Sequence, residues 1–247
     1  MMAKIPTRIK RIAKLTPYST KLVVDLGTDH GYLPVLLISW GKSNKVIASD
    51  IAALPLKQAR ETLKKFNVES KVELRQGDGL SVLKEGEFPD VIVIAGIGGN
   101  NILEILSQAE NTWNHGGEVS LIIQPMDEIK AVRKFLLDSG FAIETEDIVK
   151  ERQKLYPIIH FCPGFEKVQD DVILELGPRL IESPKWEFVE YLDYVIARKE
   201  KKIMNLKKAK KQDELIKEKL EKVMNDLNKI KEVKRVVLKR MADNTKN

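Results

Sequence analysis

The sequence predicts an α/β fold: a doubly wound, mostly parallel sheet with an antiparallel edge strand, followed by a C-terminal antiparallel coiled coil of helices. Strand-length apolar runs alternate with amphipathic helical stretches over residues 22–162. The apolar runs are nearly continuous, which is typical of parallel strands buried on both faces. After Pro184 the chain contains neither Gly nor Pro, and its apolar residues recur about every 3.5 positions, as in a coiled coil.

The expected elements follow one another from a basic amphipathic helix at 7–15, in which Ile9, Ile12 and Leu15 share one stripe. Buried parallel strands are expected at 22–26, 45–50, 71–76, 90–96 and 119–124. Helices are expected between and after them at 32–40, 55–66, 100–109 and 127–139. The segments 141–151 and 156–162 should close the sheet as an antiparallel pair, with Pro157 suited to an edge strand.

The C-terminal segment is expected to fold back on itself as a helical hairpin. The stretch KKAKKQDE at 207–214 is almost wholly polar, which marks the tip of such a hairpin. The alternative is one continuous helix, which at about 1.5 Å per residue would be too long for the domain to cover. We therefore expect two domains, at 1–165 and 166–247.

Composition limits the function classes. The 247 residues suffice for one well-buried α/β domain with an appendage, and no apolar run approaches the roughly 18 residues of a membrane span. The N-terminus lacks the apolar core and cleavage site of a secretory signal. The single cysteine, Cys162, excludes an internal disulfide, and the three histidines are far apart, which argues against a metal site. We expect a cytoplasmic monomer with no metal and no membrane partner.

Charge is distributed unevenly along the chain. Residues 1–21 hold six Lys or Arg and no acid, and residues 185–247 hold 19 bases and 11 acids. The segment between them holds 17 bases and 25 acids, a net charge of −8. An acidic body with two basic ends suggests a polyanionic partner, bound by the ends. The alternative is a solvated lysine-rich helix with no such partner.

Glycines follow the strands at the positions where a parallel sheet binds its ligands. They form clusters after the first, third and fourth expected strands: Gly27 and Gly31, Gly77 and Gly79, and Gly96, Gly98 and Gly99. The carboxyl ends of parallel strands lie at one edge of the sheet, and ligands bind there. The sequence therefore predicts a ligand site formed by these loops.

The loop after the first strand has the order Asp25-x-Gly27-x-Asp29-x-Gly31, which is neither the dinucleotide fingerprint nor a P-loop. An acid ahead of such glycines suits S-adenosylmethionine, whose ammonium it would orient. Asp50 ends the second strand, where a carboxylate accepts hydrogen bonds from ribose hydroxyls. Asp78 follows the third strand, where it can accept one from the exocyclic amine of adenine. A strand-end Asp is often only a helix cap, so the prediction depends on all three occurring in order.

Five segments together resemble a known family: LVVDLGTDHGYLP, KVIASDI, LRQGDGL, DVIVIAGIGG and LIIQP. In this order and spacing they look like the bacterial tRNA (adenine-22-N1)-methyltransferases, over roughly residues 5–162. The resemblance implies a Rossmann-like class I methyltransferase domain with a C-terminal tRNA-binding domain, S-adenosylmethionine as cofactor and tRNA as partner. The residues expected to bind the cofactor are Asp25, Gly27, Thr28, Asp29, His30, Asp50, Ile51, Gly77, Asp78, Gly79, Ala95 and Gly96.

The resemblance also makes Asp29 the candidate catalytic residue. The N1 atom of neutral adenine already has a lone pair, so no proton need leave before methylation. A carboxylate beside it would accept a hydrogen bond from the exocyclic amine and stabilise the developing positive charge. It could then take a proton from that amine. The alternative is that Asp29 and His30 only shape a turn and cap the following helix.

The basic ends supply the candidate RNA-binding residues: Arg8, Lys10, Arg11, Lys14, Lys207, Lys208, Lys210 and Lys211. Other functions remain open from the residues alone. A methyltransferase acting on another RNA nucleotide, or on a small molecule, would share the cofactor site. A non-enzymatic RNA-binding protein could keep the fold, although intact acids at three strand ends argue against it.

Overall fold

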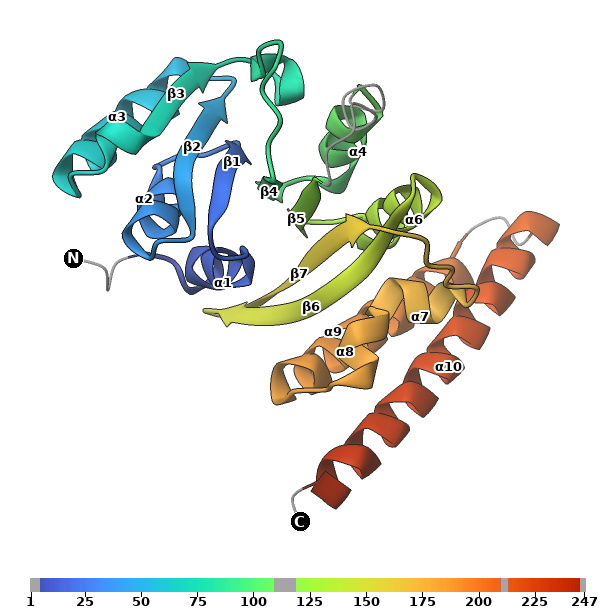
Figure 1. Cartoon of the computed structure of the whole chain (residues 1–247). Helices are drawn as coiled ribbons and strands as arrows, with labels where there is room; N and C mark the ends of the chain where they lie inside the picture. The colour runs from blue at the N-terminus through green and yellow to red at the C-terminus, as the bar shows by residue number, and fades with distance from the viewer. Residues whose placement is uncertain (1–4, 109–118, 210–212, 245–247) are drawn as a thin grey trace. The chain divides into compact units, whose positions relative to one another are not determined.

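The computed structural model describes residues 5–108, 119–209 and 213–244 (Figure 1). The chain divides into two compact units, Met1–Lys167 and Val168–Asn247. None of the helices in these ranges is both long and apolar enough to cross a bilayer.

The first unit is built on a seven-stranded sheet with the order β3-β2-β1-β4-β5-β7-β6 (Figure 1). Its strands are β1 (Thr20–Leu26), β2 (Ser43–Asp50), β3 (Val72–Gln76), β4 (Val91–Ile97), β5 (Ser120–Pro125), β6 (Phe141–Glu151) and β7 (Lys154–Pro163). The strands β1 to β5 pair in parallel, and β7 pairs antiparallel with both β5 and β6. The predicted doubly wound sheet with an antiparallel edge is confirmed.

One detail of the edge differs from the prediction. The segment that contains Pro157 is β7, which lies between β5 and β6, so the strand at the antiparallel edge of the sheet is β6. Pro157 is tolerated because β7 extends beyond the part that pairs with β5. Only Ile159 to Phe161 of β7 pair with β5, and Pro157 pairs with Ile148 of β6 alone. A proline lacks an N–H group, and here it occupies a position with a neighbour on one side only.

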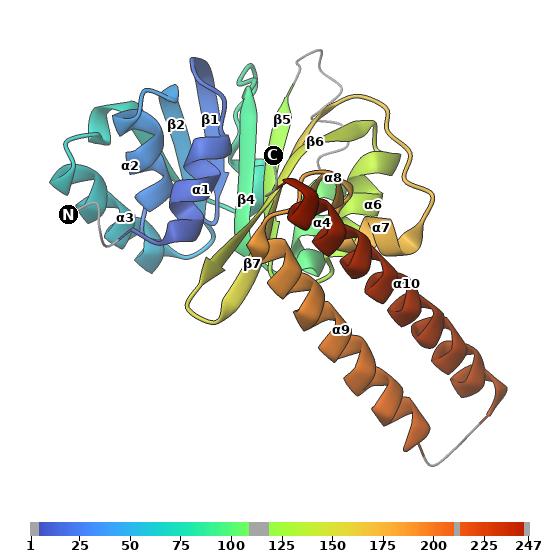
Figure 2. The same ribbon diagram turned by 90° about the horizontal axis from the view of Figure 1, so that it is seen from below.

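The described helices of this unit are α1 (Thr7–Leu15), α2 (Tyr32–Ser39), α3 (Ala53–Lys65), α4 (Gly99–Gln108) and α6 (Ile129–Asp138), with short 3-10 turns η2 (Glu69–Lys71) and η3 (Gly79–Val82). The helix α1 packs on α2, and α2 packs on α3, whereas α4 packs on α6 (Figure 2). Neighbouring residues of β1 point to opposite faces of the sheet. Because Val23 and Val24 are both fully buried, both faces are covered.

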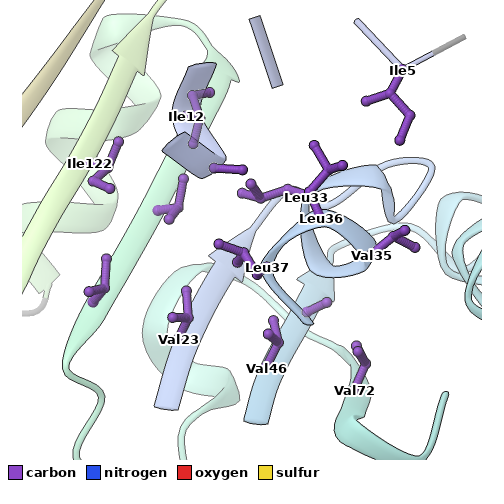
Figure 3. Close-up of a cluster of buried hydrophobic side chains, with 14 of the residues drawn as sticks. Ile5, Ile12, Val23, Leu33, Val35, Leu36, Leu37, Val46, Val72 and Ile122 are labelled. Atoms are coloured by element: carbon purple, nitrogen blue, oxygen red, sulfur yellow. The ribbon is translucent and has the colours of Figure 1, made fainter. Parts of the chain in front are cut away.

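The helix α2 lies in a cluster of buried hydrophobic side chains (Figure 3). Its segment YLPVLLIS is apolar on all sides, as expected of a helix that is buried rather than amphipathic. Leu33, Leu36 and Leu37 pack with Val23 of β1 and Val46 of β2 in this cluster. Buried strand and buried helix therefore anchor both ends of the β1–α2 loop.

The second unit is helical, with α7 (Asp171–Leu176), α8 (Pro178–Glu182), α9 (Trp186–Lys207) and α10 (Glu214–Asn244). The helices α9 and α10 pack side by side (Figure 2). Ion pairs between them join Lys199 to Asp226, Glu200 to Lys231 and Asp193 to Lys234, an antiparallel register. The predicted hairpin is confirmed, and the alternative of one continuous helix is wrong. Lys210 and Lys211 lie outside the described residues.

Candidate functional site

A cavity of about 660 Å³ lies at the carboxyl ends of β1, β2, β3 and β4. All twelve residues expected to bind the cofactor, from Asp25 to Gly96, line it. They come from four separate loops, which a parallel sheet brings to one edge. No group of three or more His, Cys, Asp or Glu suited to a metal ion occurs among the described residues.

The β1–α2 loop is held by its own backbone. The amides of Gly27 and Thr28 both donate to the carbonyl of Ser49, at 2.9 and 2.8 Å, and Gly31 donates to Thr28 at 3.0 Å. Gly27 and Gly31 both have positive φ angles, +76° and +71°. A Cβ on Gly31 would lie 3.0 Å from the Cβ of Ala59 in α3. This glycine therefore permits close helix packing, in addition to the turn.

Asp25 is buried at the end of β1, with 4% of its surface exposed. Burial raises the pKa of its carboxyl from 3.8 to about 7. The Thr28 hydroxyl offsets part of this shift, and the negative charge of Asp50 adds to it. A buried carboxylate of this kind favours a positively charged ligand group, because such a group would stabilise the ionised form.

Asp50 and Asp78 differ in how far the protein already uses their carboxylates. The Asp50 carboxylate accepts hydrogen bonds from the backbone amides of Ala52 at 3.0 Å and Asp29 at 3.4 Å. It therefore joins the second strand to the β1–α2 loop. Asp78 precedes η3, but its side chain makes no capping hydrogen bond, and only its backbone carbonyl accepts from Ser81. Its carboxylate is left for a ligand in the cavity.

Asp29 occupies the left-handed region of backbone conformation, with φ +51°. Its carboxylate is 67% exposed and lies 3.6 Å from Nε2 of His30, whose ring lies 5.7 Å from that of Tyr32. The Asp29 side chain accepts no backbone hydrogen bond from the described part of α2, so it does not cap that helix. Non-glycine residues in this conformation are uncommon and concentrate at functional sites. The protein thus holds an exposed carboxylate at the cavity, in contact with His30 and not with the backbone of α2.

Sequence reasoning missed one wall of the cavity. The helix α4 contributes one face, mostly polar, whose members recur at helical spacing: Asn101, Glu104, Ile105 and Gln108. The signal that could have found them is the pair of apolar residues Ile102 and Leu106, four positions apart, which predicts the buried face of this helix and leaves the other face for the cavity. Gly99 starts α4 where a Cβ would lie only 2.5 Å from the carbonyl oxygen of Asp127. This close approach explains why a glycine stands at position 99.

The basic residues of α1 do not share one environment. Arg8 lines the cavity, where its Nη1 donates to the buried Oε1 of Gln124. Arg11 forms an ion pair of 2.8 Å with Asp147, and Lys14 is exposed. At the end of α9, Lys207 and Lys208 are exposed as well.

Comparison with known proteins agrees with this geometry. Residues 5–159 match a family model described as a methyltransferase domain. The tRNA (adenine(22)-N(1))-methyltransferase of Bacillus subtilis is 33% identical over 156 residues, which cover 63% of this chain and 64% of that protein. The matched region therefore spans less than two thirds of that relative's length.

Solved structures match over more of the chain. The crystal structure of the B. subtilis M1A22 tRNA methyltransferase TrmK has a TM-score of 0.82 at 28% identity, covering 93% of this chain and 98% of that one. The structure of M. capricolum TrmK in complex with S-adenosyl-homocysteine has a TM-score of 0.78 at 25% identity, covering 94% and 99%. The family model covers more than half of the chain, so this chain belongs to the methyltransferase-domain family, and it is similar to the tRNA (adenine(22)-N(1))-methyltransferase of B. subtilis.

Proposed function

We propose that this protein transfers the methyl group of S-adenosylmethionine to N1 of adenine 22 in tRNA. The observation that carries the proposal is the convergence of Asp25, Asp50 and Asp78, from three successive strand ends, on one cavity of about 660 Å³. That volume is in the range of cofactor pockets. The similar proteins support both the cofactor and the substrate: the B. subtilis relative is named for adenine 22 of tRNA, and the M. capricolum TrmK structure holds S-adenosyl-homocysteine.

The carboxylates suit a ligand with two positive charges and several hydroxyl groups. Asp25 is the partner of the amino-acid ammonium, Asp50 of the ribose hydroxyls and Asp78 of the adenine amine. The bound cofactor supplies an electrophilic methyl group on a sulfonium. The loops of the protein supply orientation, because an in-line displacement depends on the alignment of the reacting atoms.

Asp29 is the residue that binds the incoming adenine. Its exposed carboxylate accepts a hydrogen bond from the exocyclic amine, which holds N1 toward the methyl group. The positive charge that develops on the ring lies against this carboxylate, and the amine proton passes to it after transfer. The nearby His30 and Tyr32 rings help to position the base.

The test of Asp29 separates chemistry from cofactor binding. We expect Asp29→Asn to lower the single-turnover rate by about 100- to 1,000-fold at saturating cofactor, since one well-placed electrostatic group contributes about this much. Its affinity for S-adenosylhomocysteine, measured by calorimetry, should fall far less than the rate, because Asp29 is only one of the residues that line the cofactor cavity. Asp138→Asn, an exposed carboxylate at the end of α6, is the matched control. An unchanged rate for Asp29→Asn would remove Asp29 from the mechanism.

We also propose that the basic ends bind the tRNA backbone, with residues 1–165 forming the methyltransferase domain and residues 166–247 the tRNA-binding domain. Lys10, Arg11, Lys14, Lys207 and Lys208 are the contacts within the described residues, and Lys210 and Lys211 complete the set. Affinity for tRNA should fall steeply with salt, and Lys14→Gln or Lys208→Gln should each reduce the salt slope by about 1. Lys64→Gln, on the surface of α3, should leave the slope unchanged.

The product identifies the substrate. After incubation of tRNA with enzyme and labelled cofactor, nuclease digestion should yield 1-methyladenosine, and mapping should place it at position 22. A different methylated nucleoside, or none, would contradict the proposed reaction and favour another RNA position or a small molecule. The enzyme should act in the cytoplasm and as a monomer. Light scattering in the presence and absence of tRNA will test the monomer.

A further inference from the structure

The charges that line the cavity are unequal in number. Five carboxylates face it, those of Asp25, Asp29, Asp50, Asp78 and Glu104. Arg8 is the only Lys or Arg among the described residues that line it. The proposed cofactor carries a carboxylate at the end of its amino-acid part. Inside a site dominated by acids, such an anion requires a cationic partner.

Arg8 is held in place by three neighbours. Its Nη1 donates to Oε1 of Gln124, a side chain with no exposed surface, and its guanidinium lies 5.2 Å from the centre of the Tyr156 ring. The third neighbour is Gly96 at the end of β4, where a Cβ would lie only 2.8 Å from Nη1. A side chain at position 96 would therefore displace the guanidinium from the cavity wall.

The donors of this guanidinium are only partly used. Nε is buried without a hydrogen-bond partner, and Nη2, which is not buried, has no hydrogen bond to any described residue. Arginine offers five N–H donors in a planar fork that matches the two oxygens of a carboxylate. Unsatisfied donors on a fixed, cavity-lining cation are what a binding site for an anion retains before its ligand arrives.

We propose that Arg8 binds the carboxylate of the methionine part of the cofactor; the inference rests on the proposed function. The chemistry of the ligand restricts where this cation can act. A guanidinium beside the sulfonium or the ammonium would face a like charge, whereas beside the carboxylate it is attracted. Arg8 is then a cofactor-binding residue, in place of the tRNA contact that its position in a basic helix suggested.

The test compares two ligands that differ only in this carboxylate: S-adenosylmethionine and decarboxylated S-adenosylmethionine. A hydrogen-bonded charge pair contributes about 10- to 100-fold in affinity, so the wild type should prefer the carboxylated ligand by that factor. Arg8→Gln should abolish most of this preference, because it should lower the affinity for the carboxylated ligand only. Lys64→Gln removes the same charge from an exposed position on α3 and should keep the preference.

Titration calorimetry gives both affinities without relying on turnover. If Arg8→Gln lowered the affinities for both ligands equally, Arg8 would be a structural residue and the proposal would be overturned. Unchanged cofactor affinity with weaker tRNA binding would also overturn it, in favour of a phosphate contact. If the wild type bound neither ligand, the proposed function itself would fail, a result distinct from both of these.

A second variant tests the proposal independently, in case Arg8→Gln does not fold. Gln124→Glu leaves Arg8 in place but gives its Nη1 a carboxylate partner within the protein. This internal carboxylate competes with the ligand's, so the preference for the carboxylated ligand should fall while the affinity for the decarboxylated one does not. A thermal unfolding transition like that of the wild type confirms that the variant is folded. An undiminished preference in this variant would count against Arg8 as the partner.

Discussion

Replacing Asp25 by Asn should stabilise the free protein and weaken its binding of cofactor. The carboxyl of Asp25 has its pKa raised by burial from 3.8 to about 7. Because the folded state holds the proton more tightly than the unfolded state, ionisation of Asp25 costs stability, and this cost grows as the pH rises from 4 to 7. A shift of this size corresponds to about 4 kcal/mol when the group is fully ionised.

Asparagine is neutral at every pH and nearly the same shape as aspartate. At pH 8 the free energy of unfolding of Asp25→Asn should therefore exceed that of the wild type, by up to about 4 kcal/mol. The difference should shrink steadily as the pH falls from 7 toward 4, where the wild-type carboxyl is protonated as well. Urea unfolding, followed by circular dichroism at several pH values, measures this difference.

Cofactor binding should respond in the opposite direction. The ligand ammonium needs the ionised carboxylate, and with a pKa of about 7 the ionised fraction falls about tenfold between pH 8 and pH 6. The affinity of the wild type for S-adenosylhomocysteine should fall by about the same factor. Binding near pH 7 should also release protons, which calorimetry detects as a binding enthalpy that depends on the buffer. Asp25→Asn should bind weakly, with no such pH dependence.

A lower stability of Asp25→Asn than of the wild type at pH 8 would refute the raised pKa, because burial would then not penalise the charge. A flat affinity of the wild type from pH 6 to pH 8 would refute it as well. Asp138→Asn changes an exposed carboxylate and should leave both measurements unaltered.

Three further predictions concern packing. Glu146→Ala leaves the fully buried Arg133 without the carboxylate 2.7 Å away. The free energy of unfolding, measured in urea, should fall by about 3–5 kcal/mol. A loss below about 1 kcal/mol would refute a structural role for the pair. Gly31→Ala brings a Cβ to 3.0 Å from the Cβ of Ala59, at a residue whose φ is positive. It should lower the free energy of unfolding by about 2 kcal/mol or more and should also lower the affinity for the cofactor. The same change at Gly41, where a Cβ meets nothing within 4 Å, should lower the free energy of unfolding by less. Lys199→Met breaks ion pairs from α9 to both α7 and α10 and should destabilise the helical unit by about 2 kcal/mol. The affinity for S-adenosylhomocysteine should not change, and a changed affinity would contradict the prediction.

The local pattern of the sequence was enough to find the elements and the acids of the cavity. Buried parallel strands appear as apolar runs, and their carboxyl ends meet at one edge whatever the lengths of the helices between them. Asp25, Asp50 and Asp78 could therefore be placed around one cavity from their positions at strand ends. The polar stretch at 207–214 likewise predicted where α9 ends and α10 begins.

Other features depended on contacts between distant parts of the chain. The insertion of β7 between β5 and β6, which moved Pro157 away from the edge, follows from how the last strands pair, and their apolar patterns are compatible with either order. The raised pKa of Asp25 depends on how completely its neighbours cover it.

Arg8 shows most clearly what the sequence determined and what it left to the tertiary structure. Its spacing in a basic amphipathic helix fixed its local conformation and its charge, and these suggested a surface contact with RNA. Only the packing of α1 turned its guanidinium toward Gly96, Gln124 and Tyr156, on three different strands. Periodicity reports which face of an element is buried, but the partner of that face is decided by long-range packing, which leaves no signal in the local sequence.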